Sequence, residues 1–298
     1  MPVAIRQLTP VFAGEVDGVD CTRPIAPDEV AAIEAGMDRY AVLVFRDQDL
    51  TDEQQIAFTR HFGELESYKT AGHIRKNPDQ RLRPGMADFS NLDKDGNIIA
   101  ADDRVWFFKL GDRLWHSDSS FRPVPAKYSL LSGRVLPSWG GNTDFADMRA
   151  AYDALDARSK AEIEPLVCLH SLIYSRAAIG FTELSEEEIA AFRPIRQRLV
   201  RRHPVTGRKS LFLASHAGAI EGWTVPEAQM FLRDLVEHAT QREFVYSHEW
   251  RVGDLVMWDN RQTMHRARRF DDRNEVRDVR RTTLAGDVAT IEQPEFVP

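Results

Sequence analysis

At residues 115–121 the chain reads WHSDSSF, a segment that combines two metal-ligand side chains with apolar neighbours. It places the imidazole of His116 and the carboxylate of Asp118 two residues apart. In a strand, residues i and i+2 project to the same face, so both groups can reach one metal ion while Trp115 and Ser117 point the other way. One more histidine would complete the 2-His-1-carboxylate set that holds non-haem Fe(II) with positions left open. The alternative is a strand histidine hydrogen-bonded to a neighbouring carboxylate.

A second segment, residues 253–265, reads GDLVMWDNRQTMH and offers the missing histidine. Two short strands joined at the polar turn 259–261 would bring His265 to a strand interior, with Met264 and Arg266 on the opposite face. Taken alone, His265 is more readily interpreted as a core histidine with satisfied hydrogen bonds.

The composition limits the classes of function. The 298 residues carry a net charge of -7 and the pI is near 5.8, which argues against nucleic acid or an anionic membrane as the main partner. No apolar run approaches the roughly 20 residues that span a bilayer. Residues 1–18 lack a basic segment followed by an apolar one, so we expect a cytoplasmic location. The two cysteines, Cys21 and Cys168, support neither a disulfide framework nor a thiolate zinc site.

The pattern along the chain predicts one domain, 1–298, that is mainly β with flanking α-helices, a β-barrel or jelly roll with helices packed outside. A capping box at Thr51 and Gln54 opens one of the helices, and residues 167–174 are ambiguous between helix and strand. The other expected helices are 27–34, 146–155, 159–166, 185–192 and 226–239. The expected strands are 41–45, 128–132, 134–136, 142–145, 199–200, 210–213, 243–246, 255–258, 263–265 and 279–284.

Residues 64–112 show no periodicity and are rich in turn-forming residues. Asp95-Gly96 predicts a hairpin whose arms are 87–89 and 98–100. Long loops in compact domains are usually functional or disordered. We treat 64–112 as a candidate active-site lid, with a disordered insertion as the alternative.

Residues 277–284 combine arginines with β-branched residues, which predicts a strand. Its alternation places Arg277, Val279 and Arg281 on one face and Arg280 on the other. Two guanidinium groups that point into a barrel need anions, because an unpaired buried charge is strongly unfavourable. The planar fork of arginine suits bidentate capture of a carboxylate ligand.

Other catalytic motifs are absent from the sequence: it has no G-x-S-x-G, no H-E-x-x-H and no G-x-G-x-x-G. The remaining histidines that follow residue 170 lack a carboxylate two positions away on a strand face. We interpret them as structural or exposed: His203, His216, His238 and His248.

Together these segments resemble the Fe(II)- and 2-oxoglutarate-dependent dioxygenases, specifically the taurine dioxygenase group and within it the 2,4-dichlorophenoxyacetate dioxygenases. The resemblance runs from residues 43–46 and 54–58 to Thr283. It is densest over 114–121, 147–155, 237–246 and 253–261.

The resemblance implies a double-stranded β-helix, or jelly roll, with Fe(II) held by His116, Asp118 and His265. It also implies that Thr143 and Arg277 bind the distal carboxylate of the co-substrate 2-oxoglutarate. Arg281 matches the position that pairs with the anionic group of the substrate. Residues 64–112 are longer and differently composed than in the group, so Lys69, Thr70 and His73 are only candidates for the substrate pocket.

The implied activity consumes O2 and 2-oxoglutarate and hydroxylates a small anionic organic acid. An aryloxyalkanoate would be cleaved at its ether to a phenol and a 2-oxo acid, whereas an alkylsulfonate such as taurine would release sulfite. Two rivals are a sensor protein that has lost catalysis and a zinc hydrolase that uses the same three ligands. The sequence leaves the exact substrate and any homo-oligomer open.

Overall fold

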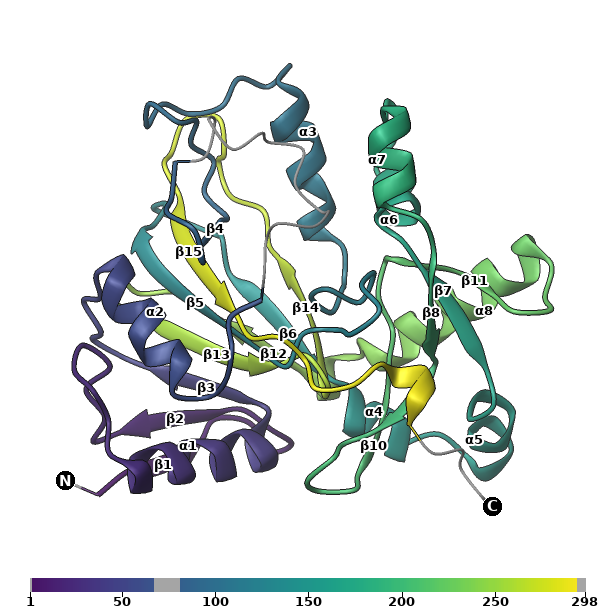
Figure 1. Ribbon diagram of the computed structural model, residues 1–298, viewed down its shortest axis with the longest axis horizontal. Coiled ribbons are helices and arrows are strands. Elements are labelled where there is room, and N and C mark those ends of the chain that lie inside the picture. The colour runs from purple at the N-terminus through teal and green to yellow at the C-terminus, as the bar shows by residue number, and fades with distance from the viewer. Residues whose placement is uncertain (1, 67–80, 294–298) are drawn as a thin grey trace.

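The computed structural model describes residues 2–66 and 81–293, and Figure 1 shows its strands gathered between helices. The helices are α1 (Pro27–Tyr40), α2 (Asp52–Arg60), α3 (Arg104–Lys109), α4 (Met148–Asp153), α5 (Ala157–Ile163), α6 (Leu172–Ala178), α7 (Glu186–Ala191) and α8 (Val225–Ala239), with the 3-10 turns η2 (Leu110–Arg113), η3 (Arg242–Phe244) and η4 (Thr290–Glu292). The strands are β1 (Ala4–Gln7), β2 (Gly14–Asp17), β3 (Val42–Phe45), β4 (Ala87–Asp88), β5 (Tyr128–Val135), β6 (Thr143–Asp147), β7 (Val167–His170), β8 (Ile195–Arg198), β9 (Val200–Arg202), β10 (Lys209–Leu211), β11 (Ala217–Ile220), β12 (Val245–His248), β13 (Leu255–Asp259), β14 (Thr263–Ala267) and β15 (Asp278–Thr283).

The largest layer is a seven-stranded sheet in the order β1-β2-β3-β13-β5-β15-β4. Its neighbouring strands are antiparallel except β2 and β3, which run parallel. Side chains alternate along the buried strands: Leu43 and Met257 lie in one apolar cluster, Val44 and Val256 in another. The two-residue period of a strand therefore gives each face of this sheet its own core.

Helices cover one of these faces, and a second sheet covers the other. Ile33 of α1 and Phe58 of α2 belong to the same cluster as Leu43. On the opposite face, Phe145 of β6 belongs to the cluster of Val44. Strand β6 is the centre of a three-stranded sheet in the order β12-β6-β14. The strands that carry the candidate ligands thus lie where two sheets pack together.

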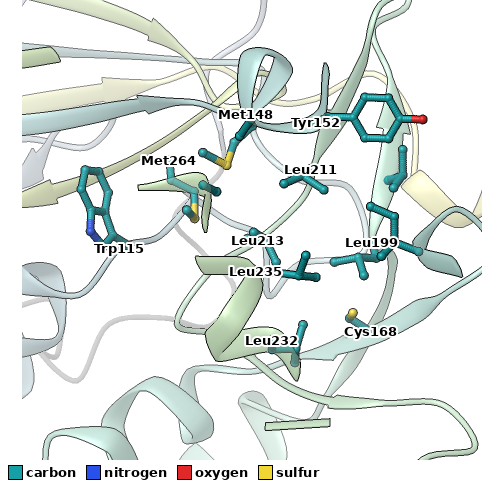
Figure 2. Close-up of a cluster of buried hydrophobic side chains, with 14 of the residues drawn as sticks. Trp115, Met148, Tyr152, Cys168, Leu199, Leu211, Leu213, Leu232, Leu235 and Met264 are labelled. Carbon is teal, nitrogen blue, oxygen red and sulfur yellow. The ribbon is translucent and has the colours of Figure 1, made fainter. Parts of the chain in front are cut away.

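A third apolar cluster joins the small sheets to α4 and α8, and Figure 2 shows part of it. The three-stranded sheet β11-β7-β8 and the pair β10-β9 contribute side chains such as Cys168 and Leu211. Trp115 and Met264 lie in the same cluster, and both are labelled in Figure 2. Because each precedes a candidate ligand histidine, this core anchors both histidine segments.

The predicted elements are largely present. The chain is a mixed α/β arrangement of several sheets with flanking helices, and the Thr51–Gln54 capping box is formed, with Gln54 N donating to Thr51 Oγ1 at 3.2 Å. The ambiguous residues 167–174 divide into β7 and the start of α6. In the described part of the chain, no helix is both long and apolar enough to cross a membrane.

The predicted hairpin with arms 87–89 and 98–100 is wrong. Strand β4 pairs instead with β15, with Asp88 opposite Arg280. The turn at Asp95-Gly96 is closed by a single bridge between Leu92 and Ile98. A turn signal identifies the turn but cannot say which distant strand its flanks will join, and the edge of the large sheet offered 87–88 a longer partner.

A buried polar network fixes the connection between β13 and β14, which passes from the large sheet to the small one. Arg261 donates to both carboxylate oxygens of Asp259, at 2.9 and 2.8 Å. Gln262 and His203 contact the same carboxylate, at 2.8 and 3.2 Å. Burial acts to raise the pKa of Asp259, but Arg261 and His203 hold that pKa well below its usual range. The connection is therefore held by a buried ion pair with its hydrogen bonds satisfied.

We predict that Asp259→Asn lowers the free energy of unfolding at pH 7 by about 3 kcal/mol or more, because it leaves the buried Arg261 charge without its partner. Because the pKa of Asp259 is lowered in the folded state, its ion pair contributes to the free energy of unfolding above the unfolded-state pKa of about 4. This contribution is lost as the pH falls. The difference between wild type and variant in urea unfolding should therefore narrow below about pH 4.

The matched control is Asp153→Asn, at the exposed pair of Asp153 with Arg208, where the change should be about 1 kcal/mol or less. Equal effects of the two substitutions would contradict the structural role of Asp259.

Candidate metal centre

His116 meets His265 through the backbone rather than through a regular strand. The two residues form an isolated bridge in which each N–H donates to the carbonyl of the other, at 2.9 and 2.8 Å. Asp118 lies in a turn, and Ser119 after it has a φ of 54°. The predicted strand over this segment is therefore wrong. The two side chains still converge, because the chain is extended at His116 and turns at Asp118.

His265 lies on β14, where it is paired with Phe145 of β6. Its flanks face away as expected: Met264 is in the apolar cluster, and the Arg266 guanidinium lies 4.5 Å from the centre of the Trp115 ring. Ser117 also faces away, donating to the carbonyl of Thr263 at 3.0 Å.

The three predicted ligands come together in a buried cluster. One ligand atom from each of His116, Asp118 and His265 lies within 4.8 Å of the others. The Nε2 atom of His116 lies 3.9 Å from Asp118 Oδ1, and the Nε2 atom of His265 lies 3.8 Å from Asp118 Oδ2. The two imidazole rings are 4.3 Å apart between centroids. This set has the composition of the 2-His-1-carboxylate site of non-haem iron proteins.

The protonation states also fit a metal. His116 Nδ1 lies 2.8 Å from the carbonyl of Leu114, which can only accept, so Nδ1 is the donor and Nε2 is the atom that faces the cluster. Burial, and then the neighbouring His116, lower the pKa of His265 well below its ordinary value. Burial acts to raise the pKa of Asp118, but Arg281 and the two histidines hold it at about 2. A neutral imidazole and a deprotonated carboxylate are the forms that bind a divalent ion.

A cavity opens beside the three ligands. Besides His116 and His265 it is lined by Phe89, Asp112, Leu131, Thr143, Trp258, Ala267, Arg277 and Arg281. All three residues predicted to bind co-substrate or substrate therefore face the same space as the ligand histidines.

Arg277 is a buried cation with few hydrogen-bond partners among the described residues. Its Nη2 donates to the carbonyl of Gly141 at 3.1 Å, while its Nε has no hydrogen-bond partner in the described part of the chain. Burial lowers its pKa to about 10, opposed by the charge of Asp112, so it stays protonated at neutral pH. Gly141 allows this approach, because a Cβ there would lie 3.2 Å from Nε and its φ is 69°. A buried cation of this kind calls for an anionic ligand.

Thr143 begins β6 on the wall of the same cavity. Trp250 Nε1 donates to its hydroxyl oxygen at 3.0 Å. Since the indole can only donate, the hydroxyl proton of Thr143 is directed elsewhere and can be given to an acceptor in the cavity.

Arg281 faces inward on β15, as the alternation predicted, and Arg280 faces the other way toward Asp52 and Asp278. The guanidinium of Arg281 lies 4.2 Å from the centre of the Phe89 ring, and its Nη1 contacts Asp118 Oδ1. Arg281 is thus shared between the ligand carboxylate and the cavity.

Several site residues were not anticipated from the sequence. Ser129 and Asn260 hydrogen-bond to Asp118, and both lie in segments interpreted only as strand and turn. His216 fits the structural interpretation, because it is buried and its Nδ1 lies 2.9 Å from Ser175 Oγ; its ring is 5.8 Å from that of His116. The strand of Ser129 carries a second serine, Ser132, so its sequence does not single out Ser129.

The other histidines in that group fit the structural interpretation. His203 contacts Asp259, His248 contacts Asp254 at 3.1 Å, and His238 contacts the carbonyl of Ala151 at 2.8 Å. Lys69, Thr70 and His73 lie outside the described residues.

Comparisons with known proteins agree with this geometry. Residues 4–283 match the family described as taurine catabolism dioxygenase TauD, TfdA family. The chain is 46% identical over 288 residues to the alpha-ketoglutarate-dependent 2,4-dichlorophenoxyacetate dioxygenase of Burkholderia sp. (strain RASC), covering 96% of this chain and 95% of that one. It is 41% identical to the (S)-phenoxypropionate/alpha-ketoglutarate-dioxygenase of Sphingobium herbicidovorans, covering 87% and 86%.

Among solved structures, the chain resembles that of AAD-2 in complex with Mn(II) and N-oxalylglycine. The TM-score is 0.95 with 59% identity, and the alignment covers 97% of this chain and 100% of that one.

We predict that His116→Ala, Asp118→Ala and His265→Ala each weaken Mn(II) binding by more than 100-fold, because each removes one of three ligands. This loss exceeds the roughly 10–100-fold typical when only a supporting group is removed. Isothermal titration calorimetry of the metal-free protein measures it. His238→Ala, at a half-buried histidine outside the cluster, should bind Mn(II) as wild type does. Wild-type affinity in any one of the three ligand variants would remove that residue from the site.

Proposed function

The chain belongs to the taurine catabolism dioxygenase TauD, TfdA family and is a 2-oxoglutarate-dependent dioxygenase, and we propose that it uses Fe(II) to hydroxylate and cleave an aryloxyalkanoate such as 2,4-dichlorophenoxyacetate. The observation that carries the proposal is a cavity lined by two inward arginines and by His116 and His265, which form a buried ligand cluster with Asp118. Identities of 46% and 41% to enzymes named for phenoxy acids favour this substrate class.

The proposed framework is a jelly roll, the double-stranded β-helix. Its two sheets would be the seven-stranded sheet and the sheet β12-β6-β14, which share the core around Phe145. The ligand histidines then lie inside, between the sheets, where side chains of alternate residues point.

When bound, Fe(II) and 2-oxoglutarate supply the oxidative chemistry: O2 is consumed, 2-oxoglutarate becomes succinate and CO2, and one oxygen atom enters a C–H bond of the substrate. His116, Asp118 and His265 would hold the metal through three positions and leave the cavity side open. Hydroxylation of the carbon next to the ether oxygen gives a hemiacetal, which collapses to a phenol and a 2-oxo acid.

Arg277 and Thr143 are the proposed binding site for the distal carboxylate of 2-oxoglutarate. The buried Arg277 has an unsatisfied Nε among the described residues, and the Thr143 hydroxyl has a proton to donate. A carboxylate between them would compensate the buried charge. N-oxalylglycine, found with AAD-2, carries two terminal carboxylates as 2-oxoglutarate does.

Arg281 is the proposed partner of the substrate's own carboxylate. It lines the cavity close to the metal ligands, and Phe89 supports its guanidinium from one side. Binding the acid here would place the adjacent C–H bonds near the metal and leave the aryl group to apolar walls. Positioning of this kind is the protein's main contribution to rate.

The alternative substrate is an alkylsulfonate of the taurine type, which the name of the family suggests. A sulfonate would use the same arginine. The zinc hydrolase and sensor interpretations do not account for a cavity with two inward arginines and family membership together.

Three further assignments stay predictions: a single domain over 1–298, a cytoplasmic location and a lid at 64–112. Phe89 and Asp112, both in the lid segment, line the cavity, which supports its role beside the site. Part of the segment, 67–80, is outside the described residues.

A substrate panel tests the proposal. Phenoxyacetate and at least one enantiomer of 2-phenoxypropionate should stimulate succinate release from 2-oxoglutarate in the presence of Fe(II) and O2, and release a phenol. Taurine should leave the rate at background. Sulfite release from taurine at the higher rate would select the alternative, and no stimulation by any of these acids would contradict the proposal.

Arg281→Ala should raise the KM for the phenoxy acid roughly 10–100-fold, because a hydrogen-bonded charge pair with the substrate is lost. Uncoupled decay of 2-oxoglutarate should persist. Arg277→Ala should instead raise the KM for 2-oxoglutarate. Steady-state kinetics with each substrate varied separates the two.

Because Arg281 also contacts Asp118, the Mn(II) affinity of Arg281→Ala is measured alongside. An unchanged KM for the acid would remove Arg281 from the substrate site.

A further inference from the structure

The ligand carboxylate of Asp118 is part of a closed ring of hydrogen bonds. The backbone N–H of Asp118 donates to Asn260 Oδ1 at 3.1 Å. Asn260 Nδ2 donates to Ser129 Oγ at 2.9 Å, and Ser129 Oγ donates to Asp118 Oδ2 at 2.7 Å. All three residues are buried. The ring thus joins the main chain of Asp118 to its own carboxylate through two other side chains.

The directions of these hydrogen bonds are fixed by their partners. Trp258 Nε1 also donates to Asn260 Oδ1, at 3.0 Å. Two N–H donors at this atom identify it as the amide oxygen, so the Nδ2 of Asn260 must face Ser129. The hydroxyl of Ser129 accepts from Nδ2 and has one proton, which can only go to the carboxylate of Asp118.

Two members of the ring, Ser129 and Asn260, are held by the large sheet. Ser129 lies on β5 between two partner strands, opposite Trp258 of β13 and Thr283 of β15. Asn260 follows β13 directly, and its backbone N–H donates to the carbonyl of Lys127 at 2.9 Å. Asp118, by contrast, lies in a turn outside the regular strands. The sheet therefore supplies the orientation that the turn itself lacks.

We propose that Ser129 and Asn260 are positioning residues that hold the Asp118 carboxylate in its metal-binding orientation. The proposal rests on the metal role of Asp118 in the proposed function. Hydrogen bonds to a ligand carboxylate fix its rotamer, and losing such a group typically lowers metal affinity 10–100-fold. Removing the Ser129 hydroxyl takes one hydrogen bond from the carboxylate and leaves Asn260 Nδ2 without its acceptor.

The test is Mn(II) binding to metal-free Ser129→Ala by isothermal titration calorimetry. We expect the Kd to rise about 10–100-fold, with wild-type secondary structure by circular dichroism. The matched control is Ser132→Ala, a buried serine on the same strand whose hydroxyl donates to Gln55 at 2.7 Å instead. It should lose similar thermal stability and keep the wild-type Kd for Mn(II).

A second variant covers the case in which Ser129→Ala does not fold. Ser129→Cys keeps the side-chain shape with a slightly larger terminal atom but offers only a weak S–H donor, so its Kd should rise in the same direction by less. Wild-type Mn(II) affinity in a folded Ser129→Ala or Ser129→Cys protein would overturn the proposal. The proposal would also be overturned if the Kd for Mn(II) rose equally in Ser129→Ala and Ser132→Ala.

Failure of the proposed function would give a different result, because the wild-type protein itself would then not bind Mn(II) at the three ligands. As a double-mutant cycle, Asn260→Ala and Ser129→Ala together should weaken Mn(II) binding by less than the product of their separate effects, because both break the same ring. Fully multiplicative effects would count against a shared role.

Discussion

The buried negative charge of Asp118 is the constraint on which the site depends. A carboxylate removed from water is strongly unfavourable unless cations and hydrogen-bond donors surround it. Here Ser129 donates to one oxygen and Arg281 contacts the other. The two imidazoles complete a space that suits a divalent ion. The sheets around it explain how these groups, distant in sequence, arrive at one carboxylate.

Charge balance connects this centre to the proposed chemistry. A divalent metal, one ligand carboxylate and the guanidinium groups of Arg277 and Arg281 leave three positive charges in the cavity. Asp112 lies 3.7 Å from the buried Arg176, so these two cancel. On the proposed assignment, the dianion 2-oxoglutarate and a monoanionic acid neutralise the remainder. A hydrolase acting on a neutral substrate would leave the buried Arg277 with only the carbonyl of Gly141 as a hydrogen-bond partner among the described residues.

The sequence predicted those parts of the site that depend on local pattern. Alternation along 277–284 placed Arg277 and Arg281 inward, and the three ligands converge as predicted. Predictions from the sequence failed where long-range strand pairing or an unusual backbone conformation determines the structure. Ser119 adopts a left-handed φ although it is not a glycine, so the sequence carries no signal for this turn and favours a strand instead. Likewise, nothing local shows that Ser129 faces Asp118, because that contact depends on how the turn sits over the sheet.

We expect His116, Asp118 and His265 to bind one divalent ion while Arg277 and Arg281 face its open side. The most direct measurement is a crystal structure of the protein grown with Mn(II) and 2-oxoglutarate, with the metal located by its anomalous scattering. The expected result is a single Mn(II) coordinated by the Nε2 atoms of His116 and His265 and by the Asp118 carboxylate, with the distal carboxylate of 2-oxoglutarate at Arg277. A metal bound elsewhere, or one that lacks any of the three side chains, would contradict it.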